Sequence, residues 1–176
     1  MLFRSREHSP CETAMLSPAW RRQLAMIVIF LAISFSTAGV GAAVSAVSVR
    51  NWYRVLSKPA WTLPDWDFGP VSTALCLLMS LGPWLVWRRT GWSTGRVALG
   101  LFAVQLALSA AWSHLFFGLH RPGIALVDII LLWVATAATA WSFGHISVLA
   151  STMFAPYLMW VSYATVLNWA IWRMNS

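Results

Sequence analysis

The sequence predicts an all-α membrane protein, a bundle of five transmembrane helices with a long aromatic-rich loop between helices 1 and 2. Of its 176 residues, 59% are hydrophobic and only 10% are charged, whereas soluble domains carry about 25% charged residues. Five apolar stretches occupy nearly the whole chain, and each approaches the roughly 20 residues that a transmembrane helix needs. The net charge is +7. We expect the basic side chains that carry it to contact lipid headgroups of the bilayer, and we expect no nucleic acid partner.

The N-terminal part divides into a tail and a first helix. Residues 1–22 are polar and contain Pro10 and Pro18, so we predict a disordered tail ahead of a membrane domain at residues 23–176. The stretch Gln23–Val49 carries no charge. A signal peptide also combines arginines with an apolar run, but that run ends after about 15 residues. We therefore predict the first transmembrane helix here, with small residues in its second half for close helix packing.

The segment Trp52–Pro70 is rich in aromatic and charged side chains and is interrupted by Pro59 and Pro64. Proline fixes its own φ and disfavours helical geometry in the residue before it. The segment is thus predicted to be a shaped loop. Two interpretations are open: its rings anchor at the membrane–water interface, or they form a lid over a flat ligand held between the helices.

The other four helices follow in close succession. We predict them at residues 70–87, 97–117, 123–143 and 147–172. Pro70 suits the first turn of a helix, and a short turn with Gly91 and Gly95 separates the second helix from the third. Pro156 is expected to kink the fifth helix. The location expected for such a multi-pass protein is a bacterial cell membrane.

The third helix has two different faces. Ala103, Ala107 and Ala111 recur every four residues and form a flat stripe that lets another helix approach closely. That helix belongs either to the same bundle or to a second copy in a homodimer. Gln105 lies on the opposite face, which we assign to the bundle interior, where its amide needs a hydrogen-bond partner.

Polar residues mark the last two helices. Asp128 is the only acidic residue within a predicted span, where a carboxylate at mid-helix costs roughly 2.5–3.5 kcal/mol. Its side chain either forms a structural hydrogen bond to a neighbouring helix or acts in ligand binding or proton transfer. Pro156, Trp160, Ala164 and Asn168 are spaced four apart. They form a ridge that is typical of either an aromatic bundle core or a ligand-binding wall.

No arrangement typical of catalysis or metal binding occurs. The spacing of metal ligands is not found among His114, His120 and His145. Of the two cysteines, Cys11 is in the polar tail and Cys76 is in a predicted span, which disfavours a disulfide or a shared metal site. We predict no catalytic residue, no metal site and no required cofactor.

Over about residues 24–175 the chain resembles the TspO/MBR family of tryptophan-rich sensory and translocator proteins. Motifs in five regions carry the resemblance, in matching order and spacing. They are Trp52-Tyr53 with Lys58-Pro59 and Trp61 in the loop, Phe68-Gly69-Pro70 at the second helix, Gln105-Leu106-Ala107 with Trp112 in the third, Ala125-Leu126 with Asp128 in the fourth, and Pro156-Tyr157 with Trp160 and Ala164-Thr165-Val166-Leu167-Asn168 in the fifth.

The resemblance implies a five-helix bundle, often dimeric, with an interior pocket under the first loop. Family members bind porphyrins such as protoporphyrin IX and haem, with proposed roles in transport, stress-linked sensing or porphyrin breakdown. Flat tetrapyrroles suit stacking on indole rings. Carried over, the ligand-binding residues are Trp52, Trp61, Trp66, Trp112, Asp128, Tyr157, Trp160, Ala164 and Asn168.

Two departures from the family pattern affect the expected activity. Ser72 and Cys76 stand where the family usually has a tryptophan and a tyrosine, which should enlarge the pocket. In the family, two tryptophans are associated with porphyrin breakdown. Ser72 occupies the position of one of them, and Trp160 corresponds to the other. We therefore expect porphyrin binding in transport or sensing. Two alternatives remain, a light-dependent porphyrin-degrading enzyme and a small-drug or cation exporter that uses Asp128 with an aromatic cage.

Overall fold

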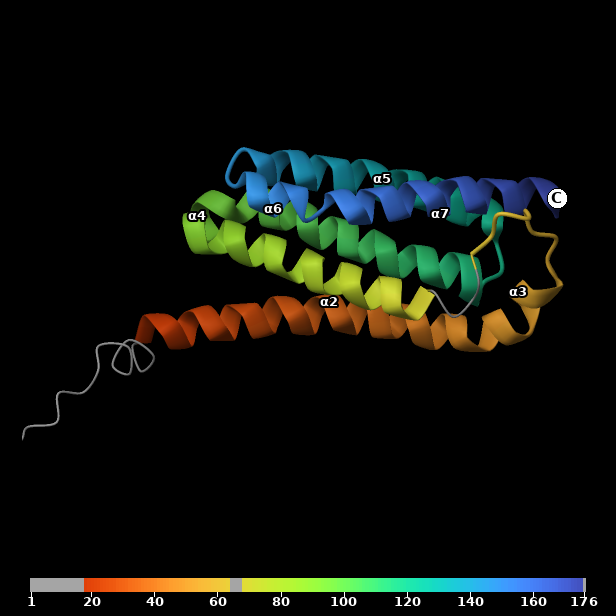
Figure 1. Ribbon diagram of the computed structural model, residues 1–176, viewed down its shortest axis with the longest axis horizontal. Coiled ribbons are helices and arrows are strands. Elements are labelled where there is room, and N and C mark those ends of the chain that lie inside the picture. Colours follow the sequence, from red (N-terminus) through yellow and green to blue (C-terminus); the bar gives the residue numbers. More distant parts are fainter. Residues whose placement is uncertain (1–17, 64–67, 176) are drawn as a thin grey trace, which may run out of the picture.

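The computed structural model describes residues 18–63 and 68–175, and within these ranges it contains helices and no strands (Figure 1). The predicted all-helical bundle is confirmed. Its helices, in chain order, are α2 (Pro18–Arg50), α3 (Trp52–Val55), α4 (Phe68–Ser113), the π-helix η2 (His114–Gly118), α5 (Pro122–Gly144), α6 (Val148–Thr152) and α7 (Ala155–Met174).

The helix α4 consists of two arms that run back alongside each other. The chain reverses at Gly91, whose backbone has φ 66° and ψ −165°, a conformation that glycine adopts without the steric cost other residues incur. The turn was predicted to be longer, extending to Gly95. The structure corrects this, because Arg88 and Arg96 are helical and Gly91 alone interrupts the helix.

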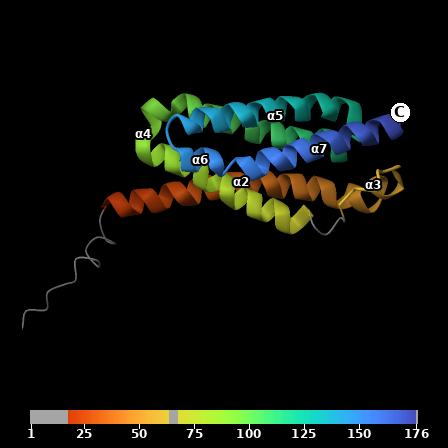
Figure 2. The same cartoon turned by 45° about the horizontal axis from the view of Figure 1, so that its top comes forward.

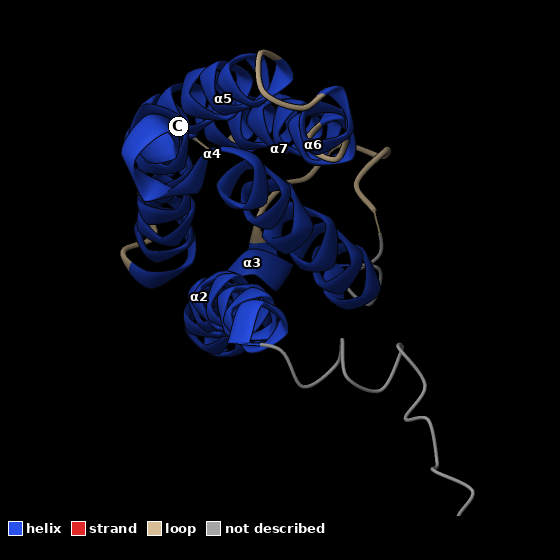
Figure 3. Cartoon of the chain, turned by 90° about the vertical axis from the view of Figure 1, so that its left-hand side faces the viewer, coloured by secondary structure: helices blue, strands red, loops and turns tan. Residues whose placement is uncertain are grey.

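The long helices lie side by side, and α6 and α7 follow each other nearly end to end (Figures 1 and 2). We call the end with Gly91 and the α5–α6 connection the turn end, and the end with α3 and the C-terminus the loop end. Viewed along the bundle, α2 lies on the side opposite α5 (Figure 3). Among the other helices, α2 packs mainly against α4.

Three helical stretches are long and apolar enough to cross a membrane, namely Ala19–Arg50, Gly69–Gly118 and Pro122–Gly144. The second of these contains both arms of α4. The chain is therefore a membrane protein by composition and by helix length. The total of five crossings, which also requires α7, stays a prediction.

Two predicted boundaries near the N-terminus are wrong. Helix α2 begins at Pro18, so residues 18–22 are helical; proline is well suited to a first helical position. Residues 1–17 of the predicted tail lie outside the described residues. The segment predicted to be all loop opens with the short helix α3, because no proline precedes Pro59 to disfavour helical geometry there.

The predicted kink at Pro156 is also wrong. The helix is interrupted before the proline, between α6 and α7, and Pro156 occupies the first turn of α7. A missing N–H costs no helical hydrogen bond at that position. The Ser147 side chain accepts a hydrogen bond of 3.3 Å from the Ala150 amide and caps α6.

Aromatic rings fill the turn end. Phe102, Phe143 and Phe154 are buried, and the Phe154 ring meets the other two edge-on, with centroid distances of 6.2 and 5.2 Å. Gly82 approaches this cluster so closely that a Cβ atom there would lie 2.6 Å from Cε2 of Phe154. The turn end is thus a tightly packed core.

The two faces of the second arm of α4 are as predicted. The Gln105 side chain is fully buried, and its Oε1 accepts a hydrogen bond of 3.1 Å from the Thr136 hydroxyl of α5. Ala103 and Ala107 are exposed and Ala111 is half-buried. The alanine stripe therefore lies on the outside of this bundle, and its use in a homodimer stays a prediction.

Candidate ligand-binding cavity at the loop end

A cavity of about 690 Å³ extends from the loop end to the middle of the bundle. Binding sites for small molecules commonly occupy about 300–1,000 Å³. The cavity is lined by the second half of α2, both arms of α4, and α7, with smaller contributions from α3, η2 and α5. Residues that form it include Ser34, Ala38, Gly41, Ala42, Ser45, Arg50, Tyr53, Ser72, Cys76, Met79, Ser109, Trp112, Phe117, Leu132, Tyr157, Trp160 and Ala164.

The cavity exists because small side chains face it. The α2 wall is formed largely by glycine, alanine, serine and threonine. We predicted that these residues bring another helix close. This is confirmed at Gly41, where an added Cβ atom would lie 2.9 Å from the Ser113 hydroxyl of α4, whereas at Gly39 an added Cβ atom would meet nothing within 4 Å. Ser72 and Cys76 line the cavity from the first arm of α4, so larger aromatic side chains at these positions would take up part of its volume.

The opposite wall is aromatic and is held in place by hydrogen bonds. Trp112, Tyr157 and Trp160 line the cavity from α4 and α7. The Trp112 indole Nε1 donates a hydrogen bond of 3.0 Å to Oδ1 of Asn168, which is buried. The Asn168 amide in turn donates to the Pro122 carbonyl of α5 at 2.8 Å. Asn168 therefore ties α4, α5 and α7 together and fixes the orientation of the Trp112 ring.

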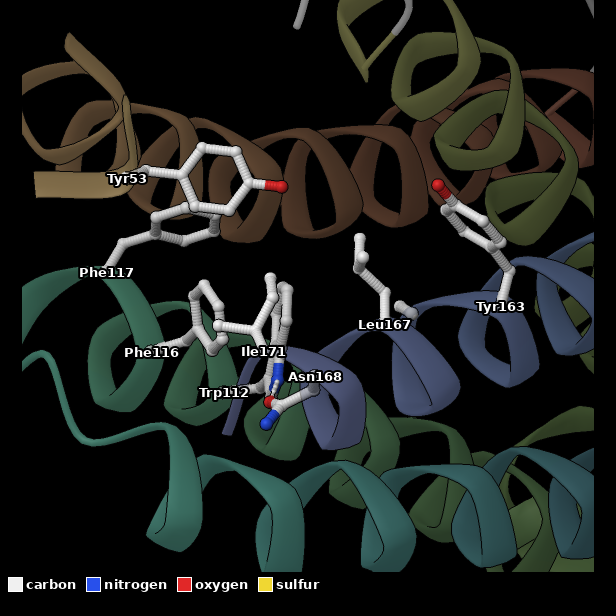
Figure 4. A pocket seen from close by; sticks show the side chains of 9 residues that line it. Tyr53, Trp112, Phe116, Phe117, Tyr163, Leu167, Asn168 and Ile171 are labelled. Atoms are coloured by element: carbon white, nitrogen blue, oxygen red, sulfur yellow. Dashed lines mark hydrogen bonds between the residues drawn. The ribbon is translucent and has the colours of Figure 1, made fainter. Parts of the chain in front are cut away.

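A second cavity of about 20 Å³ lies next to Trp112 at the loop end. Figure 4 shows Tyr53 and Tyr163 approaching it from opposite sides, with Phe116 and Phe117 below Tyr53. The Trp112 and Phe116 rings stack at a centroid distance of 5.4 Å. Ala164 lines both cavities. The small cavity has the volume of about one water molecule.

The described part of the first loop is attached to Tyr163 of α7 and to Asn175, the residue that follows α7. The Ser57 amide donates to Asn175 Oδ1, and Asn175 Nδ2 donates back to the Ser57 carbonyl, both at 3.0 Å. The Leu63 amide donates to the Tyr163 hydroxyl at 3.0 Å. The Trp61 ring contacts the same tyrosine edge-on at 5.8 Å. The loop is therefore fixed at the loop end of the bundle, next to Tyr163, which lines the small cavity.

The predicted ligand-binding residues divide into two groups. Trp112, Tyr157, Trp160 and Ala164 line the large cavity, and Asn168 lines the small one. The structure thus brings together five residues from two distant parts of the sequence.

Four other predicted site residues lie elsewhere. Trp52 is stacked on His120, with ring centroids 4.4 Å apart, and is absent from both cavity linings. Trp61 is half exposed on the loop. Trp66 lies outside the described residues. Asp128 is buried, and its Oδ2 has no hydrogen-bond partner among the residues described, yet it does not line the cavity.

Sequence reasoning missed the contribution of α2 and α3. Ser34, Ser45 and Arg50 of α2 and Tyr53 of α3 all line the cavity. The available signal was the run of small residues in the second half of α2. Such a run is compatible with either close packing or a cavity, and only the positions of the neighbouring helices decide between them.

Comparison with known proteins gives evidence of family membership that is independent of the structure. The model of the TspO/MBR family matches residues 25–173. The human translocator protein is 44% identical over 127 residues, which cover 71% of this chain and 75% of that protein. The tryptophan-rich protein TspO of Chlorobaculum tepidum is 36% identical over 156 residues, 88% of this chain and 98% of its own. The tryptophan-rich sensory protein of Cereibacter sphaeroides is 37% identical over 151 residues, 86% of this chain and 92% of its own.

Proposed function

Because the chain belongs to the TspO/MBR family, we propose that it binds porphyrins or similar flat hydrophobic ligands within the membrane, for their transport or for stress-linked sensing. One observation carries the proposal: the cavity of about 690 Å³ has an aromatic wall that includes Trp112 and Trp160. Indole rings offer extended apolar faces on which a flat conjugated ligand stacks. The protein itself needs no cofactor for this role.

Tryptophan fluorescence of the purified full-length protein tests the proposal, with protoporphyrin IX as the probe. We expect saturable quenching in the dark, weaker in Trp160→Phe because the smaller ring offers less stacking area. The matched control is Trp141→Phe, since Trp141 is 74% exposed and absent from both cavity linings. The control should remove a fluorophore without changing the affinity.

Two outcomes would contradict the proposal. Quenching that does not saturate would mean that the cavity takes another class of ligand. An equal loss of affinity in Trp160→Phe and Trp141→Phe would place the porphyrin outside the cavity.

The same sample under illumination separates binding from degradation. We expect the porphyrin absorption spectrum to remain stable in light, because Ser72 offers a hydroxyl where a second indole is usual in the family. Bleaching to a new absorbing product would instead favour the enzyme. The cation-exporter alternative gains no support from the cavity, because Asp128 is not among the residues that line it.

We also propose that two copies associate through the stripe of Ala103, Ala107 and Ala111. The stripe is on the outer surface, and small residues let helices approach closely in lipid. Replacing Ala107 by leucine should shift the protein toward the monomer in lipid nanodiscs, as measured by single-molecule subunit counting. An unchanged count would exclude this contact.

A further inference from the structure

Arg50 is the last residue of α2 and lines the large cavity at the loop end. Its side chain is also exposed, so it lies where the cavity meets the outside of the bundle. Among the described residues that line the cavity, Arg50 is the only charged one. The cavity therefore has one cationic end and an otherwise neutral wall.

The rest of the cavity wall is neutral but not wholly apolar. Ser34 is 1% exposed, lines the cavity at mid-bundle, and its hydroxyl has no hydrogen-bond partner among the described residues. Asp128, the one carboxylate in the described part of the chain, is not in the lining. The balance of charge thus favours a ligand with an anionic group at the loop end over a cationic ligand.

The two nearest basic residues in the sequence are placed differently. Arg54 of α3 is exposed and does not line the cavity. The Lys58 ammonium lies 4.2 Å from the centre of the Tyr53 ring, where it makes a cation–π contact, and Lys58 is likewise absent from the lining. Of these three cations, Arg50 alone is in position to meet a ligand in the cavity.

We propose that Arg50 binds a carboxylate of the ligand and so fixes its direction in the cavity. The ligand class is a flat apolar molecule with a carboxylate at one edge; its apolar body lies between Trp160 and the small residues of α2. A guanidinium donates two parallel hydrogen bonds to a carboxylate, which makes it selective for this group. The inference rests on the proposed function and specifies the ligand that the site prefers.

The test compares protoporphyrin IX with its dimethyl ester, which has the same ring but no ionised carboxylate. Affinities are measured for the full chain in nanodiscs of zwitterionic lipid, by tryptophan quenching. We expect the unmodified protein to prefer the acid by about tenfold, the size of one charge-assisted hydrogen bond. Arg50→Gln should abolish this preference and leave the affinity for the ester unchanged.

Two further variants give matched controls. Arg54→Gln removes a cation from the same end of the bundle and should keep the full preference for the acid. Arg50→Lys keeps the charge but loses the paired donors, and should retain only part of the preference.

The possible outcomes separate this inference from the proposed function. If acid and ester bind equally well to the unmodified protein, the porphyrin site stands but the role of Arg50 is wrong. The role is equally wrong if Arg54→Gln reduces the preference as much as Arg50→Gln. It is also wrong if Arg50→Gln changes binding of neither form, as expected when Arg50 contacts a lipid phosphate instead. If neither form binds, the proposed function itself fails.

Discussion

The two ends of the bundle have similar apolar helices but opposite interiors. At the turn end, Phe102, Phe143 and Phe154 fill the space between α4, α5 and α6. At the loop end, a cavity of about 690 Å³ separates α2 from α7. The difference lies in the size of the facing side chains. At the turn end the Phe154 ring packs against Gly82, whereas at the loop end the small side chains of α2 do not fill the space in front of the aromatic wall. Packing at one end thus supports a preformed cavity at the other.

The largest effect should follow from opening the packed end. Phe154→Ala removes a ring with 0% exposure, and we expect it to lower the free energy of unfolding by about 3–5 kcal/mol, as is usual for such a cavity. Unfolding in mixed micelles with increasing denaturing detergent measures this. Met159→Ala, which changes a residue that is 74% exposed, should have little effect. Similar losses in the two variants would mean that the turn end is not a tight core.

A pair of glycines sharpens the same comparison. At Gly82, an added Cβ would lie 2.6 Å from the Phe154 ring; at Gly39, which lines the cavity, it would meet nothing within 4 Å. We expect Gly82→Ala to destabilise the protein by about 1–3 kcal/mol through overpacking. Gly39→Ala should stabilise it by about 0.5–1 kcal/mol through its better helix propensity. Thermal unfolding in detergent measures the change in stability for both variants. If both variants are stabilised, or both destabilised, the two ends do not differ in packing as described.

Features of the fold and the cavity that depend on short stretches of sequence could be predicted from the sequence. Features that depend on how the helices are placed against one another could not. The helices follow from apolar runs of sufficient length, and the inward direction of Gln105 follows from helical periodicity. The part of the cavity wall that α7 forms was expected from the spacing of Trp160 and Ala164. The wall formed by α2 was not, because small residues are compatible with either contact or empty space. Likewise, Asp128 lies on a motif-bearing helix but away from the cavity, and this depends on how α5 is rotated in the bundle.

The next effect is expected at the loop end, at the buried amide of Asn168. Asn168→Leu leaves the Trp112 indole N–H and the Pro122 carbonyl without the partner they now have. We expect a loss of about 1–3 kcal/mol in the free energy of unfolding and weaker porphyrin quenching, because Trp112 loses its fixed orientation. The change should be smaller when Trp112→Phe is already present, since the indole N–H is then gone and only the Pro122 carbonyl loses a donor. Strict additivity of the two changes would show that the hydrogen bond does not couple them.

The smallest effect concerns the described part of the first loop, which is bonded to Tyr163. Tyr163→Phe removes the hydroxyl that accepts from the Leu63 amide at 3.0 Å but keeps the ring that contacts Trp61. Because this hydrogen bond is exposed, its removal should cost only about 0.5 kcal/mol and leave global stability nearly unchanged. Hydrogen exchange at the Leu63 amide should nevertheless accelerate by two- to threefold, roughly the factor that corresponds to this energy. If exchange accelerates over the turn end as well, the loop and the packed core form one cooperative unit, and the two ends of the bundle do not behave independently.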